Sequence, residues 1–305
     1  MKNTLLACIL AYVESRKSFL KESTYARYRN LIDNYIRSTI GLTELSDFNN
    51  RKLQYYCDSL IEQKVSLTVI KEIVLLVKLS LRKEAKLNGT TPPYIDLDLP
   101  LERKNKKIQF LNKVEQKQLI TYICDSKRQK YIGVFLALMT GLRIGEICAL
   151  KWKDIDLKKR VVVVNKTLQR VCYKGQKSKI LIDEPKTRNS QREIPINNIL
   201  YDYLLEARPI NRELYVLTYS TTPTEPRNYR KIFNTLMKKL KLQHISFHAL
   251  RHTFATRLIE NKVDLKTVSE LLGHSSVNIT ISIYVHSEFK TKRKAVKTLD
   301  NILLK

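Results

Sequence analysis

The stretch His248-Ala249-Leu250-Arg251-His252 decides the fold of this sequence. Residues three apart on a helix lie on the same face, so His248 and Arg251 are expected to point the same way. A histidine and an arginine on one helical face arise by chance in many proteins, so this stretch alone is weak evidence for any particular fold or function. Its meaning depends on three other short motifs in the same part of the chain.

These three motifs are equally ordinary when each is taken alone. Residues 140–146 read TGLRIGE, and an arginine and a glutamate three apart on a helix usually form a structural ion pair. Residues 185–187 read PKT, and a lysine in a turn is usually just exposed. Residues 272–274 read LGH and are followed by Tyr284, one of 16 tyrosines in the chain. The order and spacing of all four motifs therefore matter more than any one of them.

Taken together, the motifs and their flanks resemble the tyrosine recombinase (phage integrase) family, and among its members the integrases of phages and conjugative transposons. The resemblance implies a mainly α fold with a small antiparallel β-sheet or hairpin (α+β). It also implies a two-domain C-shaped clamp, made of a helical core-binding domain and a catalytic domain. The implied function is that of a site-specific DNA recombinase that works through a 3′-phosphotyrosyl intermediate and integrates or excises a mobile genetic element.

The resemblance also assigns roles to individual residues. Glu146 matches the acidic residue that orients the first arginine, and His252 matches a common but non-catalytic residue. Arg143 and Arg251 match the two phosphate-binding arginines of the catalytic set, and Lys186 matches a proton-donating lysine at the tip of a β-hairpin. His248 and His274 match its two histidines, and Tyr284 matches the nucleophile.

The chemistry explains why such residue types are needed. A tyrosine hydroxyl has a pKa near 10, so forming phenolate at pH 7 costs roughly 4 kcal/mol unless cations or a base assist. Arginine forks match two phosphate oxygens and bind more strongly as charge builds on them in the transition state. The leaving sugar 5′-oxygen needs a proton, which Lys186 would supply.

Composition points to a polyanionic partner. The chain has 56 Lys and Arg against 29 Asp and Glu, a formal net charge of +27, which favours nucleic acid. The resemblance implies that this nucleic acid is a double-stranded DNA recombination site. Its five cysteines are odd in number and form no C-x-x-C pair, so they are expected to be reduced thiols. No nucleotide-binding loop or His-rich metal spacing occurs, and the sequence predicts no cofactor and no metal. No apolar run approaches the roughly 18 residues that span a bilayer, so the expected location is cytoplasmic and no membrane partner is expected.

The sequence predicts two domains joined by a linker. Residues 1–89, a helical core-binding (SAM-like) domain, contain no proline and a single glycine before position 89, and apolar periodicity predicts helices at about 3–18, 24–40, 50–63 and 67–87. Residues 90–108 form the proline-containing linker. Residues 109–305 form the catalytic domain, with helices at about 113–126, 130–140 and 144–150, strands at 161–165, 180–183 and 192–196, and helices from residue 200 onward.

Further DNA contacts and protein partners are expected from the resemblance and the charge pattern. The tail, residues 287–305, is basic and then amphipathic, and is expected to dock on a neighbouring subunit in a tetrameric synapse. DNA-bending accessory proteins are further candidate partners. Basic residues of the linker and hairpin are expected to contact the phosphate backbone, namely Arg103, Lys104, Lys106, Lys107 and Arg188.

Three alternatives remain open at this point. An Xer-type resolvase of chromosome, plasmid or element dimers would use the same residues. However, the ten-residue distance from His274 to Tyr284 and the hairpin sequence PKTRNSQREIP are more typical of mobile-element integrases. A type IB topoisomerase would use the same nucleophile without exchanging strands. A non-catalytic DNA-binding protein would form no covalent adduct.

Overall fold

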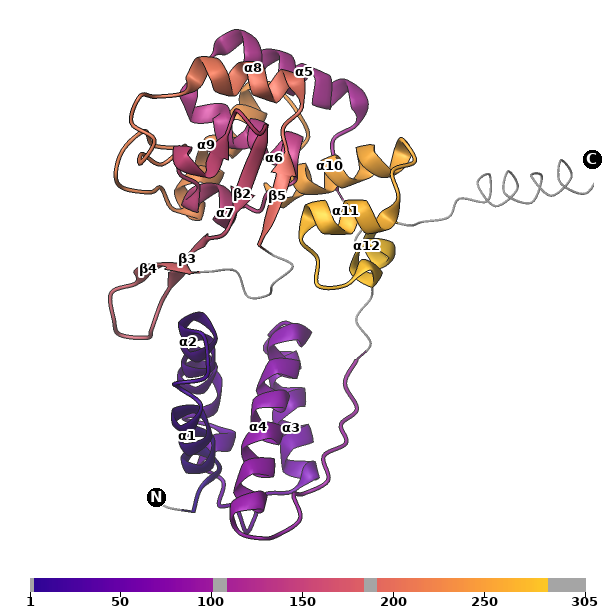
Figure 1. Ribbon diagram of the computed structural model, residues 1–305. Helices are drawn as coiled ribbons and strands as arrows, with labels where there is room; N and C mark the ends of the chain where they lie inside the picture. Colours follow the sequence, from indigo (N-terminus) through magenta and orange to yellow (C-terminus); the bar gives the residue numbers. More distant parts are fainter. Residues whose placement is uncertain (1–2, 101–108, 184–190, 285–305) are drawn as a thin grey trace, which may run out of the picture. The chain divides into compact units, whose positions relative to one another are not determined.

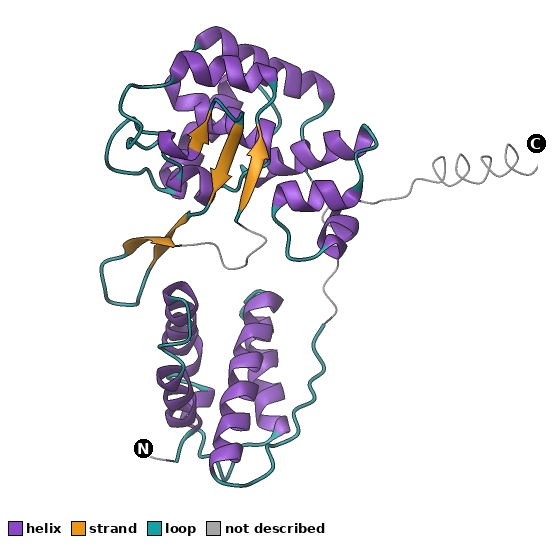
Figure 2. Cartoon of the chain, viewed as in Figure 1, coloured by secondary structure: helices purple, strands orange, loops and turns teal. Residues whose placement is uncertain are grey.

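The computed structural model describes residues 3–100, 109–183 and 191–284, with the backbone alone for residues 282–284. The chain divides into two compact units, each drawn in Figure 1. Unit 1 comprises Met1–Lys106 and Arg170–Lys179, and unit 2 comprises Lys107–Gln169 and Ile180–Lys305. Helices dominate both units and the strands are few and short (Figure 2), which confirms the predicted mainly helical α+β fold.

Unit 1 is built from helices that bury an apolar core. α1 packs against α4, which begins where the Ser66 side chain accepts a hydrogen bond from the backbone N–H of Val69. A π-helical turn at Ile32–Ile36 continues α2, and a 3₁₀ turn follows at Ile40–Leu42. Three of the helices match those predicted to within three residues at each end, and these are α1 (Leu5–Ser15), α3 (Asn50–Glu62) and α4 (Leu67–Leu87). The second, predicted at about 24–40, is α-helical only as α2 (Glu22–Leu31) and ends with the π-helical turn at Ile36.

Part of the segment predicted as the linker belongs structurally to unit 1. Ile95, Leu97 and Leu99 pack against the core of the four helices. Two amide side chains of α3 bind the same segment from the side: Asn50 exchanges hydrogen bonds with the backbone of Asp96, and Gln54 does so with Asp98. Asn50 and Gln54 are four residues apart on one face of a helix, and Asp96 and Asp98 are two residues apart on an extended chain, so the two pairs can meet in register. These contacts and the apolar packing hold the segment against unit 1 as far as Leu99.

The hydrophobic core of unit 2 is larger than that of unit 1. All residues of its central helix α6 except Met139 are buried, and α10 packs against it. α5 begins with a capping box, in which Asn112 and Glu115 exchange hydrogen bonds. The helices are α5 (Lys113–Ser126), α6 (Ile132–Thr140), α7 (Ile144–Ala149), α8 (Asn198–Ala207), α9 (Pro226–Lys239), α10 (His248–Glu260), α11 (Leu265–Leu272) and α12 (Val277–Tyr284).

The fold also contains two small sheets, and the turn of the second one belongs to unit 1. β1 (Ile155–Asp156), β2 (Val161–Val164) and β5 (Arg192–Pro195) form an antiparallel sheet in the order β1-β2-β5, with Val162 opposite Ile194. β3 (Thr167–Val171) and β4 (Lys179–Asp183) form a separate pair. The turn between β3 and β4 clusters with unit 1, where the ring of Tyr173 lies 6.3 Å from that of Tyr25. The strands β1 and β3 were not predicted.

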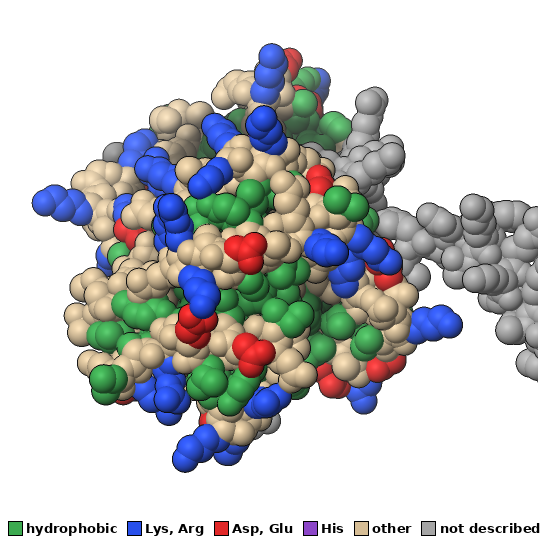
Figure 3. Space-filling view, turned by 90° about the horizontal axis from the view of Figure 1, so that it is seen from above, with side chains coloured by type: hydrophobic (Ala, Val, Ile, Leu, Met, Phe, Trp, Pro, Cys, Tyr) green, Lys and Arg blue, Asp and Glu red, His purple; other side chains and the backbone are tan. Residues whose placement is uncertain are grey.

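The surface of unit 2 is both basic and partly apolar. Figure 3 shows hydrophobic side chains grouped among Lys, Arg, Asp and Glu side chains on the end of unit 2 that carries α5 and α8. Val114, Ile199 and Leu205 are the exposed large apolar residues of these two helices. Within the ranges that the structure describes, none of the helices is long and apolar enough to cross a bilayer.

Candidate active site

The site begins at the N-terminus of α7, where Glu146 holds Arg143. One Glu146 oxygen accepts from Nη1 of Arg143 at 2.8 Å, and the other accepts from the backbone N–H of Arg143, also at 2.8 Å. Glu146 therefore caps its own helix and binds the guanidinium at once. Nη2 of Arg143 donates to the carbonyl of Gly273 at 3.1 Å. About a third of the Arg143 side chain stays exposed, so a ligand can reach it.

Arg251 reaches the same place from α10. It is 2% exposed, and its Nη1 donates to the carbonyl of Gly141 at 2.8 Å. Gly141 ends α6 with a φ of 68°, and a Cβ there would lie 2.6 Å from the Phe254 ring. Only glycine satisfies both requirements, and this explains its place in the TGLR motif. The turn it makes brings Arg143 and the acceptor for Arg251 together.

His248 and His252 stand next to Arg251 on α10. Their rings meet edge to face with centroids 4.7 Å apart. Loss of hydration and the nearby His252, Arg251 and Arg143 lower the pKa of His248 to about 4. Part of His248 stays open to solvent, and His252 is half-buried. At neutral pH His248 is therefore an uncharged imidazole that can accept a proton.

His274 joins the site immediately after α11. Gly273 ends that helix in the left-handed conformation, with a φ of 63°. Nδ1 of His274 lies 2.9 Å from the hydroxyl of Thr280 in α12. Burial, followed by the charges of Arg251 and Arg143, lowers the pKa of His274 to about 4. His274 is thus a second neutral imidazole that lies within the field of both arginines.

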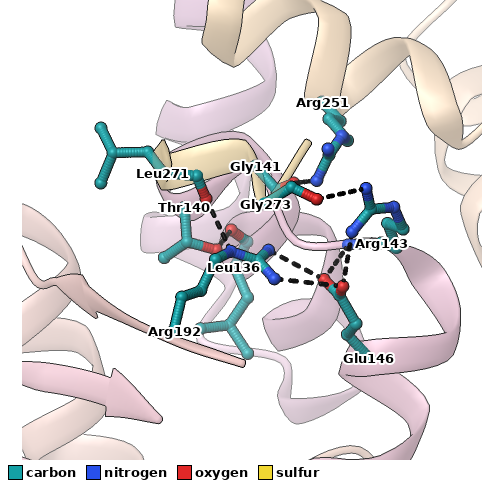
Figure 4. A network of polar contacts seen from close by, with 9 residues as sticks. All are labelled: Leu136, Thr140, Gly141, Arg143, Glu146, Arg192, Arg251, Leu271 and Gly273. Carbon is teal, nitrogen blue, oxygen red and sulfur yellow. Dashed lines mark hydrogen bonds and ion pairs between the residues drawn. The ribbon is translucent and has the colours of Figure 1, made fainter. Parts of the chain in front are cut away.

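A residue that was not predicted completes the network in Figure 4. Arg192, the first residue of β5, binds both carboxylate oxygens of Glu146 and the carbonyl of Leu271. Burial alone would raise the pKa of Glu146, but Arg192 and Arg143 together hold that pKa below its ordinary range. A detectable signal was present in the sequence. Arg192 shares the inward face of β5 with the buried Ile194, and a charge on an inward face needs a buried partner.

The remaining predicted residues differ in how far the structure describes them. The backbone of Tyr284 forms the end of α12, the helix that also carries Thr280. The other predicted residues lie outside the described ranges, and these are Lys186, Arg188, Arg103, Lys104, Lys106, Lys107 and the tail at 287–305. In the described part of the chain, no group of three or more His, Cys, Asp or Glu side chains is arranged to hold a metal ion.

The observed geometry suits an anion that carries several oxygens. Arg143 and Arg251 are anchored by backbone carbonyls from two turns, and each guanidinium has five N–H donors in a rigid fork. Two neutral imidazoles lie beside them. A phosphate group is the ligand that best matches paired arginine forks.

Comparisons with known proteins agree with this chemistry. Residues 109–291 match the model of the phage integrase family. A XerC-like tyrosine recombinase of Caldanaerobacter subterraneus is 32% identical, covering 93% of this chain and 79% of the relative. The ICEBs1 integrase of Bacillus subtilis is 26% identical, covering 98% of this chain and 83% of the relative.

Solved structures share the fold. The Tn1549 transposon integrase, solved in complex with transposon right end DNA, has a TM-score of 0.79 at 23% identity and covers 97% of this chain and 99% of its own. A lambda integrase tetramer bound to a Holliday junction has a TM-score of 0.66 at 19% identity and covers 94% of this chain and 79% of its own. Because the family model spans more than half of the chain and a relative above 30% identity aligns over nearly all of it, this chain belongs to the phage integrase family of tyrosine recombinases.

Proposed function

We propose that this site-specific recombinase breaks and rejoins DNA strands through Tyr284, with Arg143, Arg251, His248, His274 and Lys186 as the catalytic residues and Glu146 in support. The observation that carries the proposal is the convergence of two anchored guanidinium groups and two neutral imidazoles near the end of α11. Such a set binds a phosphodiester and accepts a proton without a metal ion.

The arginines act on the phosphate. Their anchoring by the Gly141 and Gly273 carbonyls means that little reorganisation is needed when charge develops on the non-bridging oxygens. Removing one such donor from an enzyme typically costs about 10²–10³ in rate. Arg143 and Arg251 therefore lower the barrier as well as bind DNA.

The proton and the bonds can be followed through the reaction. A neutral imidazole, His248 or His274, takes the proton of the Tyr284 hydroxyl as its oxygen attacks phosphorus. The bond from phosphorus to the 5′-oxygen breaks, and Lys186 protonates the departing oxygen. The product is a 3′-phosphotyrosyl ester, which the 5′-hydroxyl of another strand attacks in the reverse sense. One ester replaces another at each step, so no nucleotide is consumed.

The DNA partner is a duplex recombination site, in keeping with a net charge of +27. Unit 1 is proposed as the core-binding domain, and the basic residues at positions 103–107 and Arg188 as backbone contacts. The proposed location is the cytoplasm, in keeping with a DNA substrate. DNA-bending accessory proteins remain candidate partners. The ten-residue distance from His274 to Tyr284 favours a mobile-element integrase, with an Xer-type resolvase as the second candidate.

We also propose that residues 287–305 dock on a second copy of the chain and help to form a tetramer on DNA. The exposed apolar side chains Ile199 and Leu205 on α8 offer the kind of surface that an amphipathic segment covers. Deleting residues 290–305 should leave single protomers bound to DNA and abolish tetramers in a gel-shift assay. Cooperative, fully active tetramers of the deletion variant would refute this part of the proposal.

A trap for the covalent intermediate tests the central proposal. Nicked duplexes that tile the DNA flanking the gene are incubated with protein, because loss of a short fragment beyond the nick prevents rejoining. Wild type and Tyr201→Phe, a matched control whose ring packs on Arg160 in unit 2, should form an adduct on a denaturing gel. Tyr284→Phe should bind the same duplexes and form none. An adduct that persists in Tyr284→Phe would refute Tyr284 as the nucleophile.

A further inference from the structure

Arg192 is a buried cation to which the proposed reaction gives no role. Its Nη1 and Nη2 donate to the two oxygens of Glu146 at 3.2 and 3.0 Å, and its Nε donates to the carbonyl of Leu271 at 2.7 Å. Its side chain is 7% exposed and that of Glu146 is 4% exposed. The Nε, Nη1 and Nη2 atoms of Arg192 thus all donate to groups of the protein itself.

Arg192 contacts the two segments that hold Arg143 in place. Arg143 is held by the Glu146 carboxylate on one side and by the Gly273 carbonyl on the other. Arg192 binds the same carboxylate, and it binds Leu271, two residues before Gly273 in the chain. One planar guanidinium thus fixes the distance between α7 and the end of α11, the two segments that carry the anchors of Arg143 (Figure 4).

Charge neutralisation does not explain this arrangement. Glu146 is already paired with Arg143, and burying a second guanidinium beside it carries a desolvation cost. The bidentate geometry, however, fixes the orientation of the carboxylate, and an Arg143 that shifts by about 1 Å would lose its alignment with the transition state.

We infer that Arg192 is a positioning residue, which acts on catalysis by fixing the place of Arg143 through Glu146 and Leu271. This inference rests on the proposed function, because it needs Arg143 to bind the scissile phosphate. In this role Arg192 acts through its contacts with Glu146 and Leu271. Its removal should therefore affect the step that Arg143 serves and leave other steps unchanged.

The test compares two forms of the scissile group in the trapped duplex. A methylphosphonate replaces one charged non-bridging oxygen by a methyl group, so the need for an arginine at that oxygen is reduced. On the normal phosphodiester, Arg192→Met should slow adduct formation by about 10²-fold. On the methylphosphonate Arg192→Met should slow the reaction several-fold at most, and Arg143→Ala should behave in the same way. The double variant Arg143→Ala/Arg192→Met should react no more slowly than Arg143→Ala alone. The effects of two substitutions on the rate do not add when one residue acts through the other.

Arg212→Met provides the matched control. Arg212 is an exposed arginine of unit 2 whose guanidinium donates to the carbonyls of Trp152 and Ile155 and not to Glu146. Any loss that it causes should be equal on the two substrates. Equal losses for Arg192→Met on both substrates, or a double variant whose loss is the product of the two single losses, would overturn the inference and leave Arg192 a structural residue.

A second variant keeps the test decisive if Arg192→Met does not fold. Arg192→Lys keeps the charge but not the bidentate fork, so it should show a smaller loss with the same dependence on the phosphodiester charge. A charge-independent loss in Arg192→Lys would contradict the inference. Failure of the proposed function is seen separately, as absence of a Tyr284-dependent adduct in wild type, whereas failure of this inference leaves that adduct intact.

Discussion

Unit 1 and unit 2 bury different kinds of side chain. Within the described ranges, the buried polar residue of unit 1 is Ser80, whose hydroxyl bonds to the carbonyl of Leu76 in its own helix. Unit 2 buries charged groups, among them Glu146 and Arg251, next to the candidate site. Buried charge is costly unless it is paired. The difference teaches that apolar packing is sufficient to build the helical unit, while the site depends on a fixed charge network inside unit 2.

The largest expected effect comes from breaking that network. Glu146→Gln keeps the shape of the side chain but leaves Arg143 and Arg192 without their carboxylate. Removing one member of a buried ion pair typically costs about 3–5 kcal/mol, so the free energy of unfolding of unit 2 should fall by about 3 kcal/mol. The chain has one tryptophan, Trp152, which is buried in unit 2, and its fluorescence during urea unfolding reports on that unit.

The matched substitution in unit 1 is Glu72→Gln. Glu72 pairs with Arg27 on the surface, where an ion pair contributes about 0–1 kcal/mol. The helices of unit 1 contribute strongly to the circular dichroism of the protein. The unfolding midpoint of Glu72→Gln, followed by circular dichroism, should hardly differ from that of wild type. If the two substitutions destabilise their units equally, the contrast between an apolar and a charge-supported unit does not hold.

The same contrast explains how much could be predicted from the sequence. The helices of unit 1 follow from apolar periodicity, because packing alone decides where each helix lies. Arg143, Glu146, His248, Arg251 and His274 lie together as the motifs predicted, although their catalytic roles stay predictions.

Two features were missed for physical reasons. The inward-facing position of Arg192 on β5 indicates that it needs a buried partner, but Glu146 lies 46 residues away and no local pattern identifies it as that partner. The segment around Ile95, Leu97 and Leu99 was predicted as linker from its prolines and its lack of helical periodicity. Its alternation of apolar residues has the period of an extended chain, and that pattern predicts packing on one side.

A smaller effect should follow from releasing this segment from α3. Gln54 donates to the carbonyl of Asp98 at 3.1 Å and accepts from its N–H at 2.9 Å. Loss of two such bonds typically costs about 1–2 kcal/mol in all. In Gln54→Ala, hydrogen exchange of the Asp98 amide should accelerate roughly tenfold, since each 1.4 kcal/mol corresponds to a factor of ten.

Gln63→Ala is the control for that experiment, because Gln63 is exposed at the end of the same helix. It should leave the exchange of Asp98 unchanged. Exchange rates at Asp98 that are identical in wild type and Gln54→Ala would mean that apolar packing alone holds the segment. Unit 1 would then depend on polar contacts even less than we infer.

A further small effect is a difference in the response of the two units to acid. All five histidines lie at position 244 or later, so unit 1 contains none. Burial and the nearby Arg251 hold the folded-state pKa of His274 at about 4, against about 6.5 in the unfolded chain. Between these values the unfolded chain binds a proton that the folded chain does not, and stability must fall as the pH drops through this window.

Lowering the pH from 7 to 5 should therefore destabilise unit 2 by about 1 kcal/mol through His274, after allowance for the screening of a half-exposed ring. The Trp152 transition in urea should move while that of unit 1 stays in place. His274→Gln should reduce the shift without removing it, because His248 titrates in the same direction. Glu146 does not interfere, since its lowered pKa means that its contribution is lost only at more acidic pH. Equal acid shifts in both units, or an unchanged shift in His274→Gln, would show that the imidazoles of the site are not held neutral by their surroundings.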